Sequence, residues 1–326
     1  MRWDAPVGRR PSAASTMRRT LKQTLAQYTD DATIISELHD VPPYRVYSVS
    51  LGGQRAVLKI DDHPRGHAAD EGRVHEYVAT HTSAAVPAVL GVGSDHYLTD
   101  WHDDIATAGD SIDTDWAHAA GVWLGTLHAD TAGKFDGFGR LRDCDGALEC
   151  TAHDDWTDAV TARIAYHRPF LESIGYGDVA DAVNAFFHDY PDVFDGTGEP
   201  VLCHGDVHPE HVVRTATGVV LGIDFEHALV APAEYDYWRT VMPYFEARED
   251  VDETVTRAFR DGYESVRSLP NDIEDRRPVY RLVNWVAFIE SLYLQEMVGP
   301  TKRAKAGEWM RNRVFETLEM LRETSR

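Results

Sequence analysis

Lysine is scarce in this sequence of 326 residues. The only lysines are Lys22, Lys59, Lys134, Lys302 and Lys305. Acidic residues number 54 against 32 lysines and arginines, so the formal net charge is −22. A field of this sign repels nucleic-acid phosphates, and no basic face or alternation of basic and aromatic residues appears along the chain. We therefore expect no nucleic-acid partner.

Cysteines and long apolar segments are also few. Cys144, Cys150 and Cys203 include no CxxC pair, which excludes a disulfide-dense scaffold and fits a reducing cytoplasm. No apolar run reaches the length of a membrane span, and the arginines near the N-terminus precede no apolar segment of a signal peptide. We therefore predict a cytoplasmic protein without a membrane partner. Residues 1–30 are expected to be a leader and a helix from Met17 to Tyr28.

The acidic composition also favours arginine over lysine. In this respect it resembles proteins of salt-loving archaea, in which surface carboxylates keep the chain hydrated in concentrated salt. Because 43% of the residues are hydrophobic and the chain is long enough for two lobes, we expect a globular protein that folds without disulfides. Nothing in the sequence indicates its oligomeric state.

Most of the chemical signal lies in one stretch near the middle of the chain. An apolar run, Val201 to Cys203, leads into a polar loop with Asp206 and His211, and a second carboxylate, Asp224, follows a short hairpin. Two carboxylates and a third ligand can hold a divalent cation, and a spare carboxylate can accept a proton from a substrate hydroxyl. The alternative is that each aspartate only caps a turn. The whole set favours a phosphoryl-transfer site.

The hairpin between the two carboxylates determines how closely they approach. Residues 212–215 and 218–223 are β-rich and flank an Ala216-Thr217 turn. The expected register pairs residue 215 with residue 218, and residue 211 with about residue 222. Under this register His211 and Asp224 lie at the same end of the hairpin.

The polar loop resembles the catalytic loop of the aminoglycoside phosphotransferase family, small-molecule kinases with a protein-kinase-like fold. The family pattern His-Gly-Asp-Leu-His-Pro-Gly-Asn is similar to residues 204–211, and the family's Ile-Asp-Trp-Glu is similar to residues 223–226. The resemblance implies an α+β, bilobal protein-kinase-like fold. Residues 31–102 are expected to form an N-lobe with a five-stranded antiparallel sheet and a helix, and residues 103–326 a mainly helical C-lobe.

The resemblance also implies roles for the loop residues. Asp206 is the catalytic base for the accepting hydroxyl, His204 braces the loop, and Asp224 binds the metal as the DFG aspartate of kinases does. The family's second metal ligand, an asparagine, is His211 here, and macrolide phosphotransferases are similar in carrying histidine at this position. The resemblance implies ATP and Mg²⁺ as cofactors. Because Mg²⁺ prefers oxygen ligands and imidazole suits Mn²⁺ better, Mn²⁺ is the alternative metal.

Lys59 is the most informative residue of the first hundred. It lies in an apolar strand, Ala56 to Ile60, where an ammonium group needs a counter-charge unless it points to water at a sheet edge. The strand resembles the Val-Ala-Ile-Lys strand of kinases, which implies that Lys59 binds the ATP phosphates. On the next predicted helix, His67 to Ala79, Glu71 is the expected partner by resemblance. Glu76 is the alternative, on another helix face.

Further strands are expected on both sides of this one. They cover residues 33–38, 44–50, 86–92 and 96–101, and a Gly52-Gly53 turn joins the second to the lysine strand. The loop at 39–43 has the position of the phosphate-covering loop of kinases but contains no glycine. The last strand leads into the expected hinge. Thr99, Asp100 and Trp101 are therefore candidates for contact with adenine, by position only.

The rest of the chain reads as mostly helical. Helices are expected at residues 115–130, 154–173, 178–188, 234–246, 252–268, 277–297 and 304–323. A loop at 135–141 is similar to one in the family, and His128 and Asp236 are expected to be structural. The substrate is expected to be a small hydroxylated molecule that contacts these helices. Candidates for binding a polycationic sugar are Glu226, Glu234, Asp236, Glu290 and Glu296.

Two other functions agree with parts of the pattern. The histidines and carboxylate of residues 204–211 cluster like the ligands of a metal-dependent hydrolase, although this leaves Lys59 and the five-strand opening unexplained. The missing glycines and the histidine at 211 suggest a pseudokinase-type nucleotide-binding regulatory protein. Because Lys59, Asp206 and Asp224 are all present, we predict an active enzyme. It would be an ATP-dependent phosphotransferase that moves the γ-phosphoryl group to a hydroxyl of a small molecule.

Overall fold

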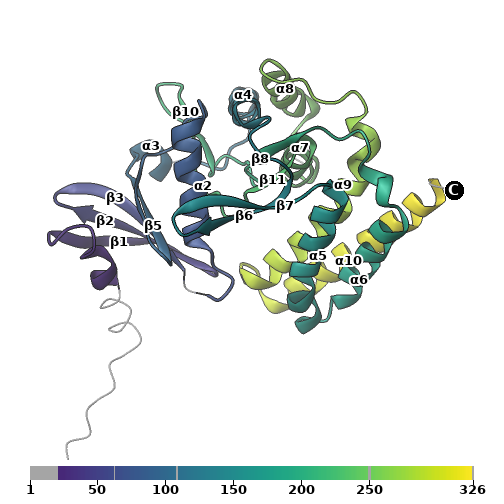
Figure 1. The fold of residues 1–326 in the computed structure, drawn as a ribbon, viewed down its shortest axis with the longest axis horizontal. Helices are drawn as coiled ribbons and strands as arrows, with labels where there is room; N and C mark the ends of the chain where they lie inside the picture. The colour runs from purple at the N-terminus through teal and green to yellow at the C-terminus, as the bar shows by residue number, and fades with distance from the viewer. Residues whose placement is uncertain (1–20, 62, 108, 249–250, 325–326) are drawn as a thin grey trace, which may run out of the picture.

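The structure is a computed structural model that describes residues 21–61, 63–107, 109–248 and 251–324. Figure 1 shows a twisted sheet at one end of the molecule and a group of helices at the other. The predicted leader and the first part of the predicted helix at 17–28 lie outside the described residues, and residues 21–25 are helical. None of the helices in the described ranges is long and apolar enough to cross a membrane.

Five antiparallel strands form the first sheet, in the order β1-β2-β3-β5-β4. Their bounds are β1 Ala32–Val41, β2 Tyr44–Leu51, β3 Gln54–Asp61, β4 Val89–Val92 and β5 His96–Asp100. The side chains of Val49, Leu58 and Leu98, which lie on different strands, are fully buried in one core. The predicted Gly52-Gly53 turn is confirmed, because both glycines have positive φ and Leu51 pairs with Gln54.

The expected phosphate-covering loop at 39–43 is wrong as a five-residue loop. Residues 39–41 continue β1 and pair with residues 44–46 of β2, so only Pro42 and Pro43 connect the two strands. Proline cannot donate a hydrogen bond to a strand ladder, which limits the pairing at this point. The β1–β2 connection is therefore a tight two-residue turn.

Helices make up most of the remaining structure. Their bounds are α2 Ala68–His81, α3 Asp103–Ala106, α4 Thr114–Thr131, α5 Trp156–Ser173, α6 Gly177–Asp189, α7 Ala233–Val241, α8 Glu253–Glu264, α9 Ile273–Leu294 and α10 Pro300–Thr324. A π-helical turn, η2 (Met242–Glu246), extends α7. α4 corresponds to the helix expected at 115–130. Its Trp116, Trp123 and Leu127 side chains are buried, and Asp113 caps the first turn by accepting from the Trp116 N–H. The α+β class, with a small antiparallel sheet followed by a mainly helical part, is confirmed.

A second sheet was not expected from the sequence. It has the order β7-β6-β11-β8, with bounds β6 Phe138–Cys144, β7 Ala147–His153, β8 Pro200–Cys203 and β11 Leu229–Pro232. The loop expected at 135–141 is therefore wrong from Phe138 onward. Asp145 and Gly146, both with positive φ, make the turn of the β6–β7 hairpin. An Asp-Gly pair is a strong hairpin signal and was available in the sequence.

The predicted hairpin after the polar loop exists with a different register. β9 (Val212–Arg214) pairs with β10 (Val220–Gly222) so that Arg214 faces Val220, one position away from the expected pairing. The connection is longer than expected because Gly218 adopts positive φ, and the Thr215 N–H donates to the Val219 carbonyl over 2.8 Å. The two strands still meet at the open end of the hairpin, where the Ile223 N–H donates to the His211 carbonyl over 2.8 Å.

Candidate active site

Lys59 on β3 is buried, with 6% of its surface exposed. Its Nζ lies 2.8 Å from Glu71 Oε2 and 2.9 Å from Asp224 Oδ1. Burial disfavours the charged amine, but Asp224 and Glu71 outweigh burial and raise the pKa of Lys59 well above its ordinary value. Lys59 is therefore a permanent cation that joins the first sheet to the segment after β10.

Glu71 on α2 is the partner that the sequence analysis preferred for Lys59. It is 2% exposed and also accepts a hydrogen bond of 2.7 Å from the Tyr97 hydroxyl. Glu76 lies on another face of the helix and pairs with Arg73 at 2.8 Å. The structure thus brings Glu71, and not Glu76, to the lysine.

The loop that follows β8 begins with a buried histidine. His204 Nε2 lies 2.8 Å from the Ile223 carbonyl, and Nδ1 accepts from the Asp206 N–H over 3.2 Å. This pattern places the proton on Nε2 and leaves neither nitrogen free for a metal. Burial lowers the pKa of His204, which keeps the ring neutral. His204 therefore ties the polar loop to the segment after β10.

Two further groups hold the loop from behind. Asp236 on α7 is fully buried, accepts from the backbone N–H groups of His204 at 2.6 Å and Gly205 at 2.8 Å, and lies 3.2 Å from the His128 ring. Gly205 has a φ of 83°, and a Cβ at this position would lie 2.5 Å from the His227 carbonyl oxygen. Only glycine meets both conditions. These contacts define the backbone conformation of the loop just before Asp206.

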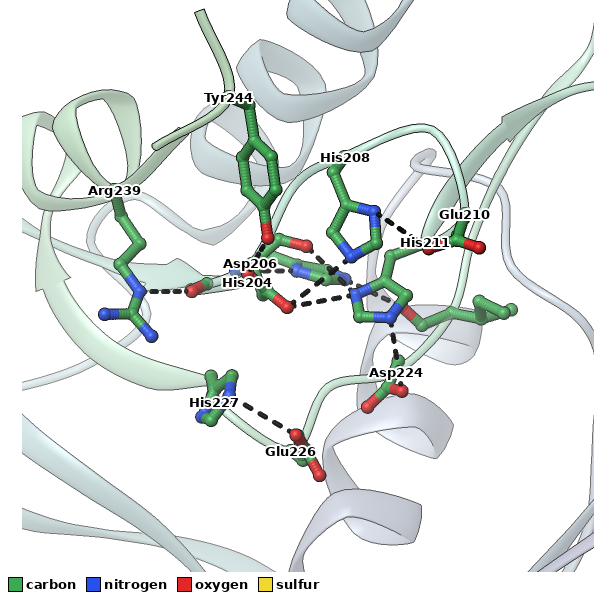
Figure 2. A network of polar contacts seen from close by, with 12 residues as sticks. His204, Asp206, His208, Glu210, His211, Asp224, Glu226, His227, Arg239 and Tyr244 are labelled. Atoms are coloured by element: carbon green, nitrogen blue, oxygen red, sulfur yellow. Dashed lines mark hydrogen bonds and ion pairs between the residues drawn. The ribbon is translucent and has the colours of Figure 1, made fainter. Parts of the chain in front are cut away.

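The carboxylate of Asp206 has three polar neighbours (Figure 2). The Tyr244 hydroxyl donates to Oδ1 over 2.7 Å, and Oδ2 lies 3.3 Å from His211 Nδ1 and 3.7 Å from His208 Nε2. Burial opposes ionisation, but the neighbouring His208 and His211 rings outweigh it and hold the pKa of Asp206 well below its usual value. Asp206 is therefore an ionised carboxylate able to accept a proton.

Asp224 lies on the other side of His211 in Figure 2. Its φ of 65° is uncommon outside glycine, although aspartate tolerates this region better than most residues. His211 Nε2 is 3.5 Å from Asp224 Oδ2, so one imidazole lies between two carboxylates. Burial lowers the pKa of His211, but Asp224 and Asp206 outweigh it and raise the pKa to about 9. Lys59, Asp224, His211 and Asp206 thus form a continuous series of charged contacts.

Residues 44–269 match the model of a family described as the phosphotransferase enzyme family. The chain belongs to this family. The matched range covers more than two thirds of the sequence and includes Lys59, Glu71 and the whole polar loop. The membership inferred from the loop motif is confirmed.

Solved structures of other phosphotransferases share the fold. A putative fructosamine-3-kinase from Thermobifida fusca YX-ER1 is 16% identical with a TM-score of 0.63, over 91% of this chain and 99% of that chain. A thermostable mutant of the aminoglycoside phosphotransferase APH(4)-Ia is 16% identical with a TM-score of 0.64, over 92% and 98%. The macrolide 2'-phosphotransferase MphH from Brachybacterium faecium is 17% identical with a TM-score of 0.52, over 91% and 97%.

These identities show likeness of fold alone, and a search of curated proteins found no significant match. The shared fold is the predicted protein-kinase-like one, with the antiparallel sheet followed by the helical part. Family and fold together identify the chain as an enzyme, a small-molecule kinase.

The candidate adenine-contact residues lie at the end of β5 in this phosphotransferase. Thr99 is buried within the sheet, the Asp100 N–H donates to the Ala88 carbonyl over 2.9 Å, and the Trp101 ring centre lies 3.4 Å from the Arg55 guanidinium carbon. The role of these three residues in binding adenine stays a prediction.

The ligand set of the hydrolase alternative is incomplete in the phosphotransferase. Asp206, His208 and His211 offer ligand atoms within 4.8 Å of one another. His204 cannot join them because both of its ring nitrogens are engaged by the backbone. His211 thus belongs to two candidate sets of metal ligands. One set contains Asp206 and His208, and the other contains Asp224.

The acidic residues considered for a polycationic sugar do not gather at the site. Glu234 pairs with Arg276 on α9, Asp236 holds the loop, and Glu296 is exposed and pairs with Arg303. Only Glu226 and Glu290 line the cavity beside the catalytic loop. Burial and the neighbouring Asp224 raise the pKa of Glu226 to about 8, although Lys59 opposes this shift.

Tyr244 is a site residue that the sequence reasoning missed, because an ordinary helical pattern surrounds it.

Proposed function

We propose that this phosphotransferase transfers the γ-phosphoryl group of ATP to a hydroxyl group of a small molecule, with the help of a divalent cation. The observation that carries the proposal is the series of contacts from Lys59 through Asp224 and His211 to Asp206. It sets a buried cation and an ionised carboxylate at one loop mouth. Phosphoryl transfer depends mostly on such positioning and charge stabilisation.

The residues divide the reaction between them. Lys59, oriented by Glu71, neutralises the α- and β-phosphates. The acceptor oxygen attacks the γ-phosphorus, the bond from that phosphorus to the bridging oxygen of ADP breaks, and the hydroxyl proton passes to Asp206. His204 keeps the loop in place through its two backbone contacts.

Nucleotide binding is supported by the relatives. Variants of APH(4)-Ia form ternary complexes with ADP and hygromycin B and with AMP-PNP and hygromycin B. In this chain the adenine ring would lie against the end of β5, at Thr99, Asp100 and Trp101. The tight Pro42-Pro43 hairpin has no glycine with which to approach the phosphates, so Lys59 carries more of their binding.

Asp224 and His211 are the residues that would hold the cation, and His211 would release its ring proton to do so. The donor set fits a divalent ion, because Asp224 is ionised and its Oδ2 lies 3.5 Å from a ring nitrogen of His211. Burial opposes its ionisation, but Lys59 and His211 outweigh burial and lower the pKa of Asp224. Carboxylate suits Mg²⁺ and Mn²⁺, whereas imidazole favours Mn²⁺. When bound, such an ion neutralises charge on the phosphate oxygens.

A direct test is ADP formation from ATP with Mg²⁺ or Mn²⁺, in low and in concentrated KCl. Aminoglycosides, macrolides, sugars and amino alcohols serve as acceptors. Acceptor-dependent release of ADP supports the proposal. ATP binding without turnover on any acceptor favours the pseudokinase-type function. Tightly bound zinc together with failure to bind ATP would return the hydrolase function.

A further inference from the structure

A cavity of about 260 Å³ lies beside the catalytic loop. Its walls come from the β1–β2 turn, β6, β7, α5 and α9, and from Glu226 and His227. Figure 2 shows Glu226 and His227 below Asp206, so the cavity borders the reaction centre. Ligand pockets usually measure about 300–1,000 Å³. The cavity therefore suits a compact ligand.

The charge of the lining is opposite to that of the whole chain. It contains four arginines and only two glutamates, whereas the sequence as a whole has 54 acidic residues against 32 basic ones. The arginines are Arg65, Arg140, Arg142 and Arg163. In a protein with a net charge of −22, an excess of guanidinium groups around one cavity points to an anionic ligand.

The acidic residues near the cavity do not balance these arginines. Asp70 lies 2.7 Å from Arg142 and 3.9 Å from Arg140, so it serves two guanidinium groups. Arg65 contacts Glu290, whose other oxygen lies 2.8 Å from a ring nitrogen of His167. Two carboxylates are thus shared among three arginines and a histidine.

Arg163 on α5 is the least satisfied of the four arginines. Within the described ranges no carboxylate lies within 4.0 Å of it, and its nearest aromatic partner is the Tyr235 ring at 6.0 Å. Its Nε is buried without a hydrogen-bond partner there, as are Arg140 Nη1 and Arg65 Nε. Leaving buried cationic donors without acceptors costs stability, and a bound anion offsets that cost.

Like charges are also crowded at the cavity wall. The guanidinium carbons of Arg65 and Arg140 lie 4.4 Å and 4.7 Å from the centre of one ring, Tyr166. Burial, together with Arg140 and Arg142, lowers the pKa of His67 to about 4. The four guanidinium groups thus outnumber the two glutamates of the cavity lining before any charge on its histidines is counted.

We propose that the acceptor of this phosphotransferase is a compact hydroxylated anion whose carboxylate or phosphate group binds Arg163 and Arg140 in this cavity. The planar guanidinium group matches both anions with paired hydrogen bonds. Phosphorylation of the ligand's hydroxyl rests on the proposed function, whereas binding of its anionic group rests on the cavity alone. A polycationic sugar would meet four guanidinium groups here.

The test measures equilibrium binding by calorimetry for two pairs of probes that differ mainly in the anion. D-gluconate is compared with D-glucitol, and glycerol 3-phosphate with glycerol, each with and without saturating AMP-PNP. We expect at least one anion to bind with AMP-PNP present and its neutral counterpart to bind at least tenfold more weakly. The gluconate and glycerol 3-phosphate arms separate a carboxylate from a phosphate ligand.

Variants locate the site. Arg163→Gln and Arg140→Gln should each weaken binding of the anion at least tenfold, which corresponds to about 1.4 kcal/mol. Arg168→Gln is the matched control, because this arginine lies on the same helix but pairs with Asp181 and Glu172 at the exposed surface. Thermal unfolding of each variant checks that it is folded.

Three results would overturn the inference: neither anion binds, AMP-PNP abolishes the binding, or both cavity variants bind like the wild type. Any of these results alongside ATP-dependent phosphorylation of a neutral or cationic acceptor removes the anion site and leaves the proposed function standing. Anion binding that is lost in the Arg163 variant, in a protein that does not bind ATP, keeps the site and removes the proposed function.

Discussion

Lys59 Nζ and Asp224 Oδ1 lie 2.9 Å apart although 165 positions separate them in the sequence. Lys59 belongs to the third strand of the first sheet, and Asp224 follows the hairpin after the catalytic loop. This single contact therefore connects the nucleotide-binding side of the proposed site to the side that would hold the cation. Glu71 on α2 also contacts the Lys59 ammonium group, at 2.8 Å.

Lys59→Met should reduce kcat/KM at least about 100-fold and lower the free energy of unfolding. The buried Glu71 would lose its cationic partner, and breaking a buried ion pair typically costs about 3–5 kcal/mol. Chemical denaturation and ADP formation measure the two effects. Lys134→Met, at an exposed lysine, is the control. Wild-type turnover by the Lys59 variant would contradict the role of this contact.

His211→Asn should change the metal preference of the enzyme. The substitution replaces an imidazole with an amide oxygen, which Mg²⁺ accepts more readily. We expect the ratio of Mn²⁺-supported to Mg²⁺-supported activity to fall about tenfold. His208→Asn, in the same loop and 3.7 Å from Asp206, should leave the ratio unchanged. A change of ratio in the His208 variant alone would move the cation to the other ligand set.

Tyr244→Phe removes the hydroxyl that donates to Asp206 Oδ1 over 2.7 Å. The hydroxyl holds the Asp206 carboxylate in its orientation, so kcat should fall at least about tenfold while KM for ATP stays the same. Because the hydroxyl stabilises the ionised carboxylate, the acid limb of the kcat profile should move to higher pH. Tyr293→Phe, in the hydroxyl pair with Tyr176, is the control. An unchanged pH profile would show that the contact is dispensable.

His75 should make the protein less stable in mild acid. Burial lowers the pKa of His75 from 6.5 to about 4 despite its hydrogen bond with the Pro87 carbonyl. The unfolded chain then binds more protons between these values, so the free energy of unfolding falls as the pH drops from 6.5 towards 4. The shift corresponds to roughly 3 kcal/mol.

His75→Gln keeps a donor for the Pro87 carbonyl and removes the titration. The loss of stability between pH 7 and pH 4.5, measured by denaturation, should be smaller in this variant than in the wild type. His81→Gln, at an exposed histidine on the same helix, is the control. Equal losses in wild type and the His75 variant would remove His75 as a source of acid sensitivity.

Local sequence patterns predicted much of the fold and the centre of the site. Lys59 in an apolar strand and the residues around Asp206 carry their chemistry in short motifs, so their placement required no knowledge of distant contacts. The Gly52-Gly53 turn and most helices also follow from nearby residues. The register of the β9–β10 hairpin did not, because Gly218 lengthens the turn by a conformation that the pattern does not determine.

Long-range features could not be predicted in the same way. Tyr244 reaches Asp206 only because α7 and its π-helical turn pack against the catalytic loop. Arg140 and Arg163 lie on different elements, and only the folded chain shows that they share a cavity with too few carboxylates. The arginines of the cavity come from separate segments, so the sequence contains no basic stretch that would indicate their cluster.

The most direct test of the central claim compares phosphoryl transfer by the wild type and Asp206→Asn under conditions where both bind ATP. Loss of the base should lower kcat about 10²–10⁴-fold and leave ATP affinity unchanged. Glu210→Gln, an exposed substitution in the same loop, should retain the wild-type rate. Undiminished transfer by Asp206→Asn would contradict the assignment of Asp206 as the proton acceptor.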